Sequence, residues 1–393
     1  MPDQPVPLSV LDLAPVIEGS TPADALRNAL DLARHAEDSG YLRYWVAEHH
    51  FATGVASSSP AVLIAAIAAV TRTIRVGSGA VQLGHQTAAV VAEAFGTLCG
   101  LYPGRIDLGL GRSGQRRAEA AREAAGGSAS AGAAAGPGGP AGGAGRAGAE
   151  ASRTVHGLLI PAVFPYATLL RSPRSGLYGT LLQQPGAQLS DFGDQVSDIL
   201  AFLRGTYRTE SGLDAEAVPA TGADAQVWIL GSSAGQSARV AGALGLPFAA
   251  NYHVSPATVL EAAEAYRAAF RPSAVLTRPH LLVSADVVVA PTDDEARQLA
   301  APYGLWVRSV RSGGAIPFPS PGSAAAHHWT DEDRALVADR VATQFAGSPA
   351  TVAKNLQVLR DATGADELLV TTITHSYAAR VRSLQLLARE WGL

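Results

Sequence analysis

Short apolar runs and longer amphipathic stretches alternate along the first hundred residues. The apolar runs predict four strands, at 8–13, 41–51, 73–83 and 105–111. The stretches between them predict helices at 21–40, 59–72 and 87–104. Thr21-Pro22 stands where the first of these helices would begin, and Ser255-Pro256 where a later one would, each as an N-cap followed by proline at the first helical position. Because the strands lack polar alternation, both of their faces are expected to be buried in a parallel sheet with crossover helices.

The same alternation resumes at residue 191 and continues to the end of the chain. It predicts a helix at 191–204 and four more strands, at 225–231, 246–253, 280–290 and 366–375. Eight strands, each with a following helix and no reversal of order, favour a closed (β/α)8 TIM barrel; an open doubly wound sheet is the alternative. We therefore expect residues 1–393 to form a single barrel domain, with its chemistry at the C-terminal ends of the strands.

Two segments interrupt the alternation. The first, at about 118–152 after the fourth strand, includes a stretch at 126–148 that is almost wholly Gly, Ala, Ser and Pro. Such a composition offers too little apolar area to offset the entropy of ordering, so it predicts a flexible surface insertion. The second, at about 300–345 after the seventh strand, is expected to be a less regular excursion.

Composition limits the classes of protein that fit. Hydrophobic residues make up 47% of the chain and charged residues 16%, which suits a globular protein with a large core. A net charge of −4 provides no basic field for nucleic acid. No segment resembles a secretion leader or reaches the roughly 20 apolar residues that span a bilayer. Cys99 is the single cysteine, which excludes an internal disulfide and suits a reducing cytoplasm, where we expect the protein.

Polar residues gather at the predicted strand ends. The residues at these ends, with Phe51, Gly111 and Gly231 as the nonpolar ones among them, are Glu48, His49, His50 and Phe51; Gln82 and His85; Gly111, Arg112 and Ser113; Gly231, Ser232 and Ser233; Asn251, Tyr252 and His253; and His375. This set contains neither the carboxylate pair of a glycosidase nor a serine in a nucleophile elbow, so the common routes of hydrolysis are disfavoured.

The segment GSSAGQSARVAG, from Gly231, has the chemistry of an anion site. A glycine and two hydroxyls lead directly into a predicted helix, whose N-terminus attracts negative charge. Arg112 at a neighbouring strand end would add a bidentate cation. The alternative is that Ser232 or Ser233 only caps the helix. GLGRSG at 109–114 also matches a dinucleotide fingerprint, but weakly, because three strand–helix units precede it.

The histidines carry alternatives of their own. His49 and His50 are adjacent, and neighbouring side chains of an extended strand point to opposite sides. We therefore expect at most one of them to face a pocket, and no metal site from the pair. A single strand-end histidine is more often structural than catalytic. Glu48 is a candidate partner that fixes a histidine tautomer or Arg112.

Three stretches, WVAEHHF, TIRVGSGAVQL and AEAFGTLCGLYPGRIDLGLGRS, resemble the first half of the luciferase-like monooxygenases. The resemblance continues at VWILGSSAGQSARVAGALGLPFAANYH, FAGSPATVAKNL and TGADELLVTTITH. It covers the chain apart from 115–190 and part of 300–340. It is nearest to a bacterial branch found beside natural-product genes, rather than to the light-emitting enzyme.

This resemblance implies a barrel that takes reduced FMN from a separate NAD(P)H:flavin reductase and reacts it with O2. One oxygen atom then passes to a small lipophilic organic substrate by hydroxylation, epoxidation or Baeyer–Villiger oxidation, and the other leaves as water. By the same resemblance His49 is the catalytic acid/base, and Arg112, Ser232 and Ser233 hold the flavin phosphate. Gly79 and Ala80 lie against the isoalloxazine ring, often through a cis peptide. Glu48, Gly231 and Asn251 complete the expected cofactor-binding residues.

The chain departs from luciferase at two of these positions. Gly111 stands where luciferase has a reactive cysteine, and Ser232 stands where it has a glutamate. Two other functions remain open: hydride transfer with the deazaflavin F420, and a flavin-binding barrel without catalysis. A homodimer through the apolar helices at 59–72 and 87–104 is also expected from the family, although an apolar helix more often packs on its own sheet.

Overall fold

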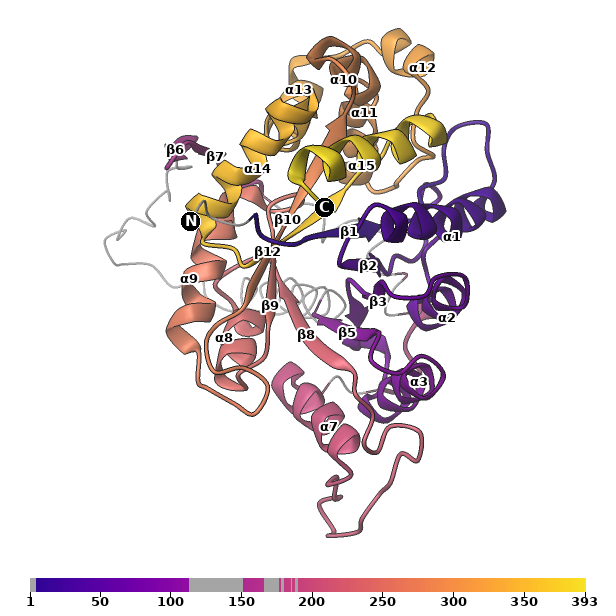
Figure 1. The fold of residues 1–393 in the computed structure, drawn as a ribbon, viewed down its shortest axis with the longest axis vertical. Helices are drawn as coiled ribbons and strands as arrows, with labels where there is room; N and C mark the ends of the chain where they lie inside the picture. The colour runs from indigo at the N-terminus through magenta and orange to yellow at the C-terminus, as the bar shows by residue number, and fades with distance from the viewer. Residues whose placement is uncertain (1–4, 113–150, 166–176, 178–179, 185, 188–189) are drawn as a thin grey trace, which may run out of the picture.

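Eight parallel strands close into a barrel in the computed structural model, which describes residues 5–112, 151–165, 177, 180–184, 186–187 and 190–393 (Figure 1). The barrel strands are β1 (Leu8–Asp12), β2 (Arg43–Val46), β3 (Arg75–Ser78), β5 (Ile106–Gly111), β8 (Gln226–Gly231), β9 (Phe248–Asn251), β10 (Leu281–Val289) and β12 (Glu367–Thr371). They pair in that order around the ring, and β12 closes it by pairing with β1. The predicted TIM barrel is confirmed.

One helix follows most strands and packs on the outside of the barrel (Figure 1). These helices are α1 (Pro22–Asp38), α2 (Pro60–Val70), α3 (Ala88–Leu101), α7 (Phe192–Arg204), α8 (Gln236–Ala243), α9 (Val259–Ala269), α14 (Pro349–Thr363) and α15 (Tyr377–Trp391). The start of α1 shows why the sequence signal was clear: Thr21 caps it, Pro22 is its first residue, and Asp24 completes a capping box. A 3-10 turn, η2 (Pro256–Thr258), precedes α9, so the predicted Ser255-Pro256 opening belongs to that turn. None of the helices in the described part of the chain has the length and apolar character of a membrane span.

Two strands are shorter than the sequence predicts. β2 ends at Val46, so 47–51 is a loop rather than the end of a strand. β3 ends at Ser78, and after a cis peptide bond between Gly79 and Ala80 the chain continues as the short strand β4 (Val81–Gln82) and the 3-10 turn η1 (Leu83–His85). The functional loops therefore begin several residues earlier than expected.

The second excursion is more regular than predicted. It contains α10 (Asp293–Ala300), α11 (Tyr303–Arg311), α12 (Pro321–Ala326), α13 (Asp331–Ala342) and the strand β11 (Phe345–Gly347), which pairs with β10. Thr292, Ser320 and Thr330 cap three of these helices through their hydroxyls, a signal that the sequence reading passed over. These helices gather above one side of the barrel (Figure 1). The insertion at about 118–152 lies almost wholly outside the described residues; a hairpin of β6 (Arg153–Val155) and β7 (Leu158–Ile160) follows it.

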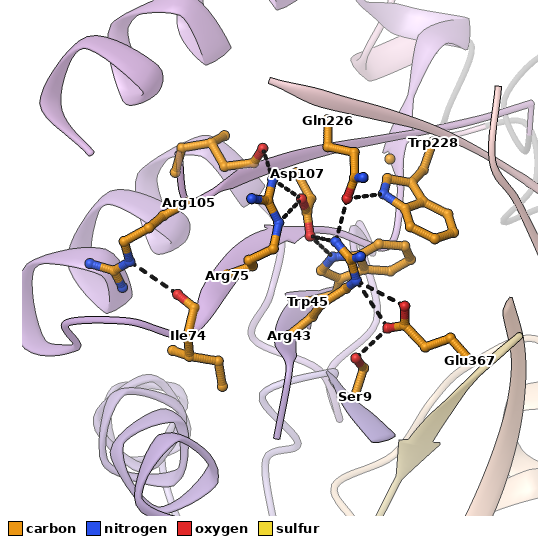
Figure 2. A network of polar contacts seen from close by, with 12 residues as sticks. Ser9, Arg43, Trp45, Ile74, Arg75, Arg105, Asp107, Gln226, Trp228 and Glu367 are labelled. Carbon is orange, nitrogen blue, oxygen red and sulfur yellow. Dashed lines mark hydrogen bonds and ion pairs between the residues drawn. The ribbon is translucent and has the colours of Figure 1, made fainter. Parts of the chain in front are cut away.

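A buried network of charges fills the N-terminal end of the barrel (Figure 2). Arg43 donates to Asp107 at 2.8 Å and to Glu367 at 2.9 Å. Asp107 also accepts from Arg75 at 2.8 Å and from the Trp45 indole at 2.9 Å. The charges of two arginines and two carboxylates thus offset each other, which allows Asp107 to be fully buried. These side chains fill the barrel interior at this end.

Candidate active site

A cavity of about 530 Å³ lies at the C-terminal end of the barrel. It is lined by every residue that the sequence assigned to catalysis or cofactor binding: Glu48, His49, Gly79, Ala80, Arg112, Gly231, Ser232, Ser233 and Asn251. Of the other predicted strand-end residues in the described part of the chain, His85, Tyr252 and His375 are not in this lining, and Ser113 lies outside the described residues.

Arg112, Ser232 and Ser233 come together at one end of the cavity because β5 and β8 are neighbours. The strands pair with Leu110 opposite Ile229, so the same register carried two residues further brings Arg112 beside Gly231. A guanidinium and two hydroxyls at one cavity wall form a donor set suited to an anion. We refer to Arg112, Ser232 and Ser233 as the anion end.

The local structure after β8 corrects one prediction. Ser232 and Ser233 do not lead directly into a helix, because α8 begins at Gln236 and its N-cap is Gly235, with no side-chain cap. The capping alternative for the two serines is therefore wrong, and their hydroxyls belong to a loop at the cavity wall. The Thr258 hydroxyl donates to the Ser232 carbonyl and holds this loop against η2.

Asp191 adds a negative charge near the anion end. It caps α7 and accepts a 2.6 Å hydrogen bond from Gln236, another residue of the cavity wall. Burial opposes ionisation of Asp191, but the bond from Gln236, two backbone N–H groups and the nearby charge of Arg112 together lower its pKa. The positive charge of Arg112 at the anion end is thus partly offset by the nearby carboxylate of Asp191.

The centre of the cavity is built from residues without bulky side chains. The cis peptide bond Gly79-Ala80 lies here, as the family resemblance implies. A Cβ on Gly79 would lie 2.8 Å from the Leu11 side chain, and a Cβ on Gly111 would lie 3.2 Å from the Ala80 Cβ. Small residues are therefore required where β3 and β5 end, and they leave a flat wall between the anion end and the rest of the cavity.

Both adjacent histidines line the cavity, which contradicts the expectation that at most one would. The alternation rule fails because β2 ends at Val46 and the chain at 49–51 is not extended; Phe51 has a positive φ of 55°. His49 is exposed, and its backbone N–H donates to Ser57 at 2.9 Å.

His50 belongs to a cluster with Glu48 and His85. One carboxylate oxygen of Glu48 lies 2.8 Å from Nε2 of His50 and 2.7 Å from Nε2 of His85. Burial opposes ionisation of Glu48, but the bonds from His50, His85 and the Gln82 backbone lower its pKa. The ligand atoms of the three residues lie within 4.8 Å of one another, a spacing that a metal ion could use. The hydrogen bonds among Glu48, His50 and His85 already explain why these side chains lie so close together, and Glu48 orients both imidazole rings.

The far side of the cavity contains residues that the sequence reading did not select. They are Ser284 and Asp286 from β10, Trp306 from α11, Arg340 from α13 and Thr371 from β12. Ser284 and Asp286 are the two polar residues, at alternate positions, in an otherwise apolar stretch of β10. Since alternate strand residues share a face, this spacing was a signal that both point inward. Trp306 and Arg340 fall in the excursion, where no strand end guided the choice.

Arg340 is the centre of a buried polar group with Asp286 and Tyr303. Its guanidinium donates to the Tyr303 hydroxyl at 2.7 Å and to Asp286 at 3.2 Å, and the Tyr303 hydroxyl in turn donates to Asp286. Burial raises the pKa of Asp286, against the opposing effect of Arg340. Close by, Nδ1 of His253 lies 2.6 Å from the Ser284 hydroxyl. Burial, with Arg340 and His49 as nearby positive groups, lowers the pKa of His253 to about 3.

Comparison with known proteins agrees with this arrangement. A model of the family described as luciferase-like monooxygenase matches residues 8–128 and 173–367. The chain is 36% identical to the uncharacterized protein YvbT of Bacillus subtilis over 98% of its length and 96% of that protein. It is 33% identical to a luciferase-like monooxygenase of Escherichia coli K12, over 98% of this chain and 97% of the relative. The solved structure of apo-MsnO8 superposes with a TM-score of 0.74 at 32% identity, covering 99% of this chain and 98% of that one. The chain belongs to the luciferase-like monooxygenase family.

Proposed function

We propose that this protein is a flavin-dependent monooxygenase that uses reduced FMN and O2 to insert one oxygen atom into a small lipophilic organic substrate. The observation that carries the proposal is the shared cavity: Arg112 and the two serines form its anion end, Gly79-Ala80 form its centre, and His49 stands at its wall. Family membership supports oxygen chemistry, and a role in secondary metabolism is proposed from the resemblance alone.

The lining residues fit a phosphorylated tricyclic cofactor. The cavity volume of about 530 Å³ is within the ~300–1,000 Å³ typical of ligand sites. The anion end suits a phosphate, and the small residues at the centre suit a flat ring. In addition, the amide oxygens of Gln82 and Asn251 are buried and accept no hydrogen bond from the described residues, so a ligand with polar hydrogens would satisfy them.

In this proposal each group of cavity residues has a separate role in the reaction. Bound reduced FMN supplies the electrons that activate O2. Arg112 with Ser232 and Ser233 binds the phosphate and so fixes where the ring lies. His49 gives or takes a proton at its imidazole beside the reacting atoms. The apolar residues around the far side exclude water, which protects a reactive oxygen species from unproductive decay.

Rapid mixing tests this proposal. Protein loaded anaerobically with reduced FMN is mixed with air-saturated buffer, and flavin absorbance is followed against free reduced FMN. We expect tight binding of reduced FMN and a course of reoxidation that differs from that of the free cofactor. Binding of F420 without binding of FMN would instead support the hydride-transfer alternative. Binding of FMN with reoxidation identical to free FMN would support a flavin barrel without catalysis.

We further propose a homodimer through α2 and α3, fed by a separate NAD(P)H:flavin reductase. Val62, Val90 and Leu101 on these helices are exposed by 70%, 55% and 63%, although most other apolar residues of both helices are buried or half-buried. Burial of such side chains between two copies is favourable. Light scattering after gel filtration should give twice the chain mass, and Val62→Asp with Val90→Asp should give a monomer.

A further inference from the structure

We propose that the cavity side formed by β12, β1 and α11 is the substrate compartment, and that it selects an uncharged molecule with an apolar body and a hydrogen-bonding head group, although Arg340 lines it. This inference rests on the proposed function, because it assumes that the flavin phosphate takes the anion end. It goes further by naming what the remaining space accepts and rejects.

The ring of strands places the two compartments opposite each other. In the pairing order, β5 and β8 carry the anion end, and the strands four places away around the ring are β12 and β1. A phosphate held by Arg112 therefore leaves the β12–β1 side free for a second molecule. Both compartments open into the same cavity, so the second molecule can reach the cofactor.

The walls of this compartment are apolar. Its lining residues are Leu11 in β1 and Leu13 just after it, Leu369 in β12 and Ile373 just after it, Val55, and Trp306 with Val310 on α11. Except for Val310, all belong to one packed apolar cluster, with Trp306 5% exposed and Leu369 1% exposed. Apolar walls of this extent stabilise a hydrocarbon body at about 25 cal/mol per Å² of buried surface.

Arg340 does not make the compartment a carboxylate site, because its charge is already compensated. The guanidinium, the Tyr303 hydroxyl and the Asp286 carboxylate form a connected set of hydrogen bonds at the cavity wall. A ligand carboxylate would have to be desolvated without a free counter-ion and would meet the charge of Asp286. A ligand ammonium group would be repelled by the positive charge of Arg340. Both signs of ligand charge are therefore disfavoured.

A neutral polar group is accommodated by His253. This ring lines the cavity, its Nδ1 is held by Ser284, and it stays unprotonated at neutral pH because burial lowers its pKa to about 3. In the tautomer in which Nδ1 accepts from the Ser284 hydroxyl, Nε2 carries the hydrogen and donates to a carbonyl or hydroxyl oxygen of the head group without adding a charge. The compartment thus has an apolar body site and neutral polar contacts, since the Thr371 hydroxyl and the Trp306 indole N–H also line it without a hydrogen-bond partner among the described residues.

Three probes of equal chain length test the selectivity: 2-decanone, decanoate and decylammonium. Binding to the purified full-length protein is measured by calorimetry at pH 7.5 in phosphate buffer, so that inorganic phosphate rather than a probe occupies the anion end. We expect 2-decanone to bind at least about tenfold more tightly than either ion, the equivalent of about 1.4 kcal/mol. Decanoate binding as tightly as the ketone would overturn the proposal, as would decylammonium doing so.

The variant Asp286→Asn tests the cause. Asparagine has nearly the same shape and still accepts from Tyr303, but it removes the negative charge that Asp286 places beside Arg340. We expect affinity for decanoate to rise at least about tenfold while 2-decanone changes little. The matched control is Asp339→Asn, which removes the carboxylate that Arg311 contacts at 2.7 Å outside the cavity lining and should leave all three affinities unchanged. If a folded Asp286→Asn protein binds decanoate no more tightly than the wild type, the proposed compensation of Arg340 by Asp286 is wrong. If the variant does not fold, the relative affinities of the wild-type protein for the three probes decide whether the proposal stands.

The two proposals fail in different ways. An FMN titration of the same wild-type protein reports on the anion end alone. Normal FMN binding with no preference for the uncharged probe contradicts the substrate compartment only. Absence of FMN binding with the preference intact contradicts the proposed cofactor and leaves the selectivity of the apolar side as a property of the cavity.

Discussion

Replacement of Arg112 by methionine separates recognition of the phosphate from recognition of the ring. Methionine keeps an unbranched apolar stem but removes the guanidinium that lines the anion end. A hydrogen bond to a charged group contributes roughly 1.5–3 kcal/mol, and the lower part of that range applies because Arg112 is partly exposed and Asp191 lies near it. The dissociation constant for FMN should therefore rise about ten- to thirtyfold.

Riboflavin, which has the same ring without the phosphate, provides the internal comparison. Fluorescence titration of wild-type and Arg112→Met protein with each flavin should show the loss for FMN and almost none for riboflavin. Arg208→Met, which breaks an exposed ion pair with Asp214, is the matched control and should change neither affinity. Equal weakening of both flavins would mean that Arg112 supports the fold or the ring, and unchanged FMN affinity would remove it from the phosphate site.

Three other outcomes follow from the structure. His49→Ala should leave FMN affinity within a few fold but lower oxygen transfer about a hundredfold or more in an assay with excess reductase, whereas normal turnover would exclude His49 from the chemistry. Asp107→Ala leaves the buried Arg43 and the partly buried Arg75 without their shared carboxylate, so urea unfolding should show a loss of about 3–5 kcal/mol, compared with less than about 1 kcal/mol for the exposed Asp214→Ala. Because the pKa of His253 is about 3 in the folded protein and near 6.5 in the unfolded chain, the unfolded state binds the extra proton between those values, and stability should fall as pH drops from about 6.5 toward 3. The His253→Phe variant should lack this part of the pH dependence, and parallel stability curves for the two proteins would contradict the assignment.

The barrel was predictable because its signals are local and repeated. Caps such as Thr21-Pro22, apolar runs of strand length and regular spacing all agree from one unit to the next, and a parallel sheet with this order has few alternatives. The anion end followed from the same logic: once β5 and β8 are neighbours, Arg112 and Ser232 must lie at the same edge. Neither step required knowledge of side-chain packing.

The sequence predicted less well which way side chains point when the residues lie in loops or inserted helices. Periodicity placed His49 and His50 on a strand, but β2 ends at Val46, so the rule that neighbours point apart did not apply. Ser232 and Ser233 looked like the start of a helix, yet Gly235 takes the N-cap position. Trp306 and Arg340 reach the cavity from helices inserted between β10 and β12, and no local pattern indicates where an inserted helix docks. Ser284 and Asp286 could have been found, since their alternate spacing marks the inner face of β10.

The position of β1 between β2 and β12 has a consequence for synthesis of the protein. As the barrel is synthesised, β1 finds one neighbour within forty residues, at 43–46, and the other only at 367–371. One edge of the growing sheet therefore stays unpaired until β12 has been made, and exposed strand edges favour association with other chains. A chain that stops before β12 should therefore aggregate rather than form a smaller folded barrel.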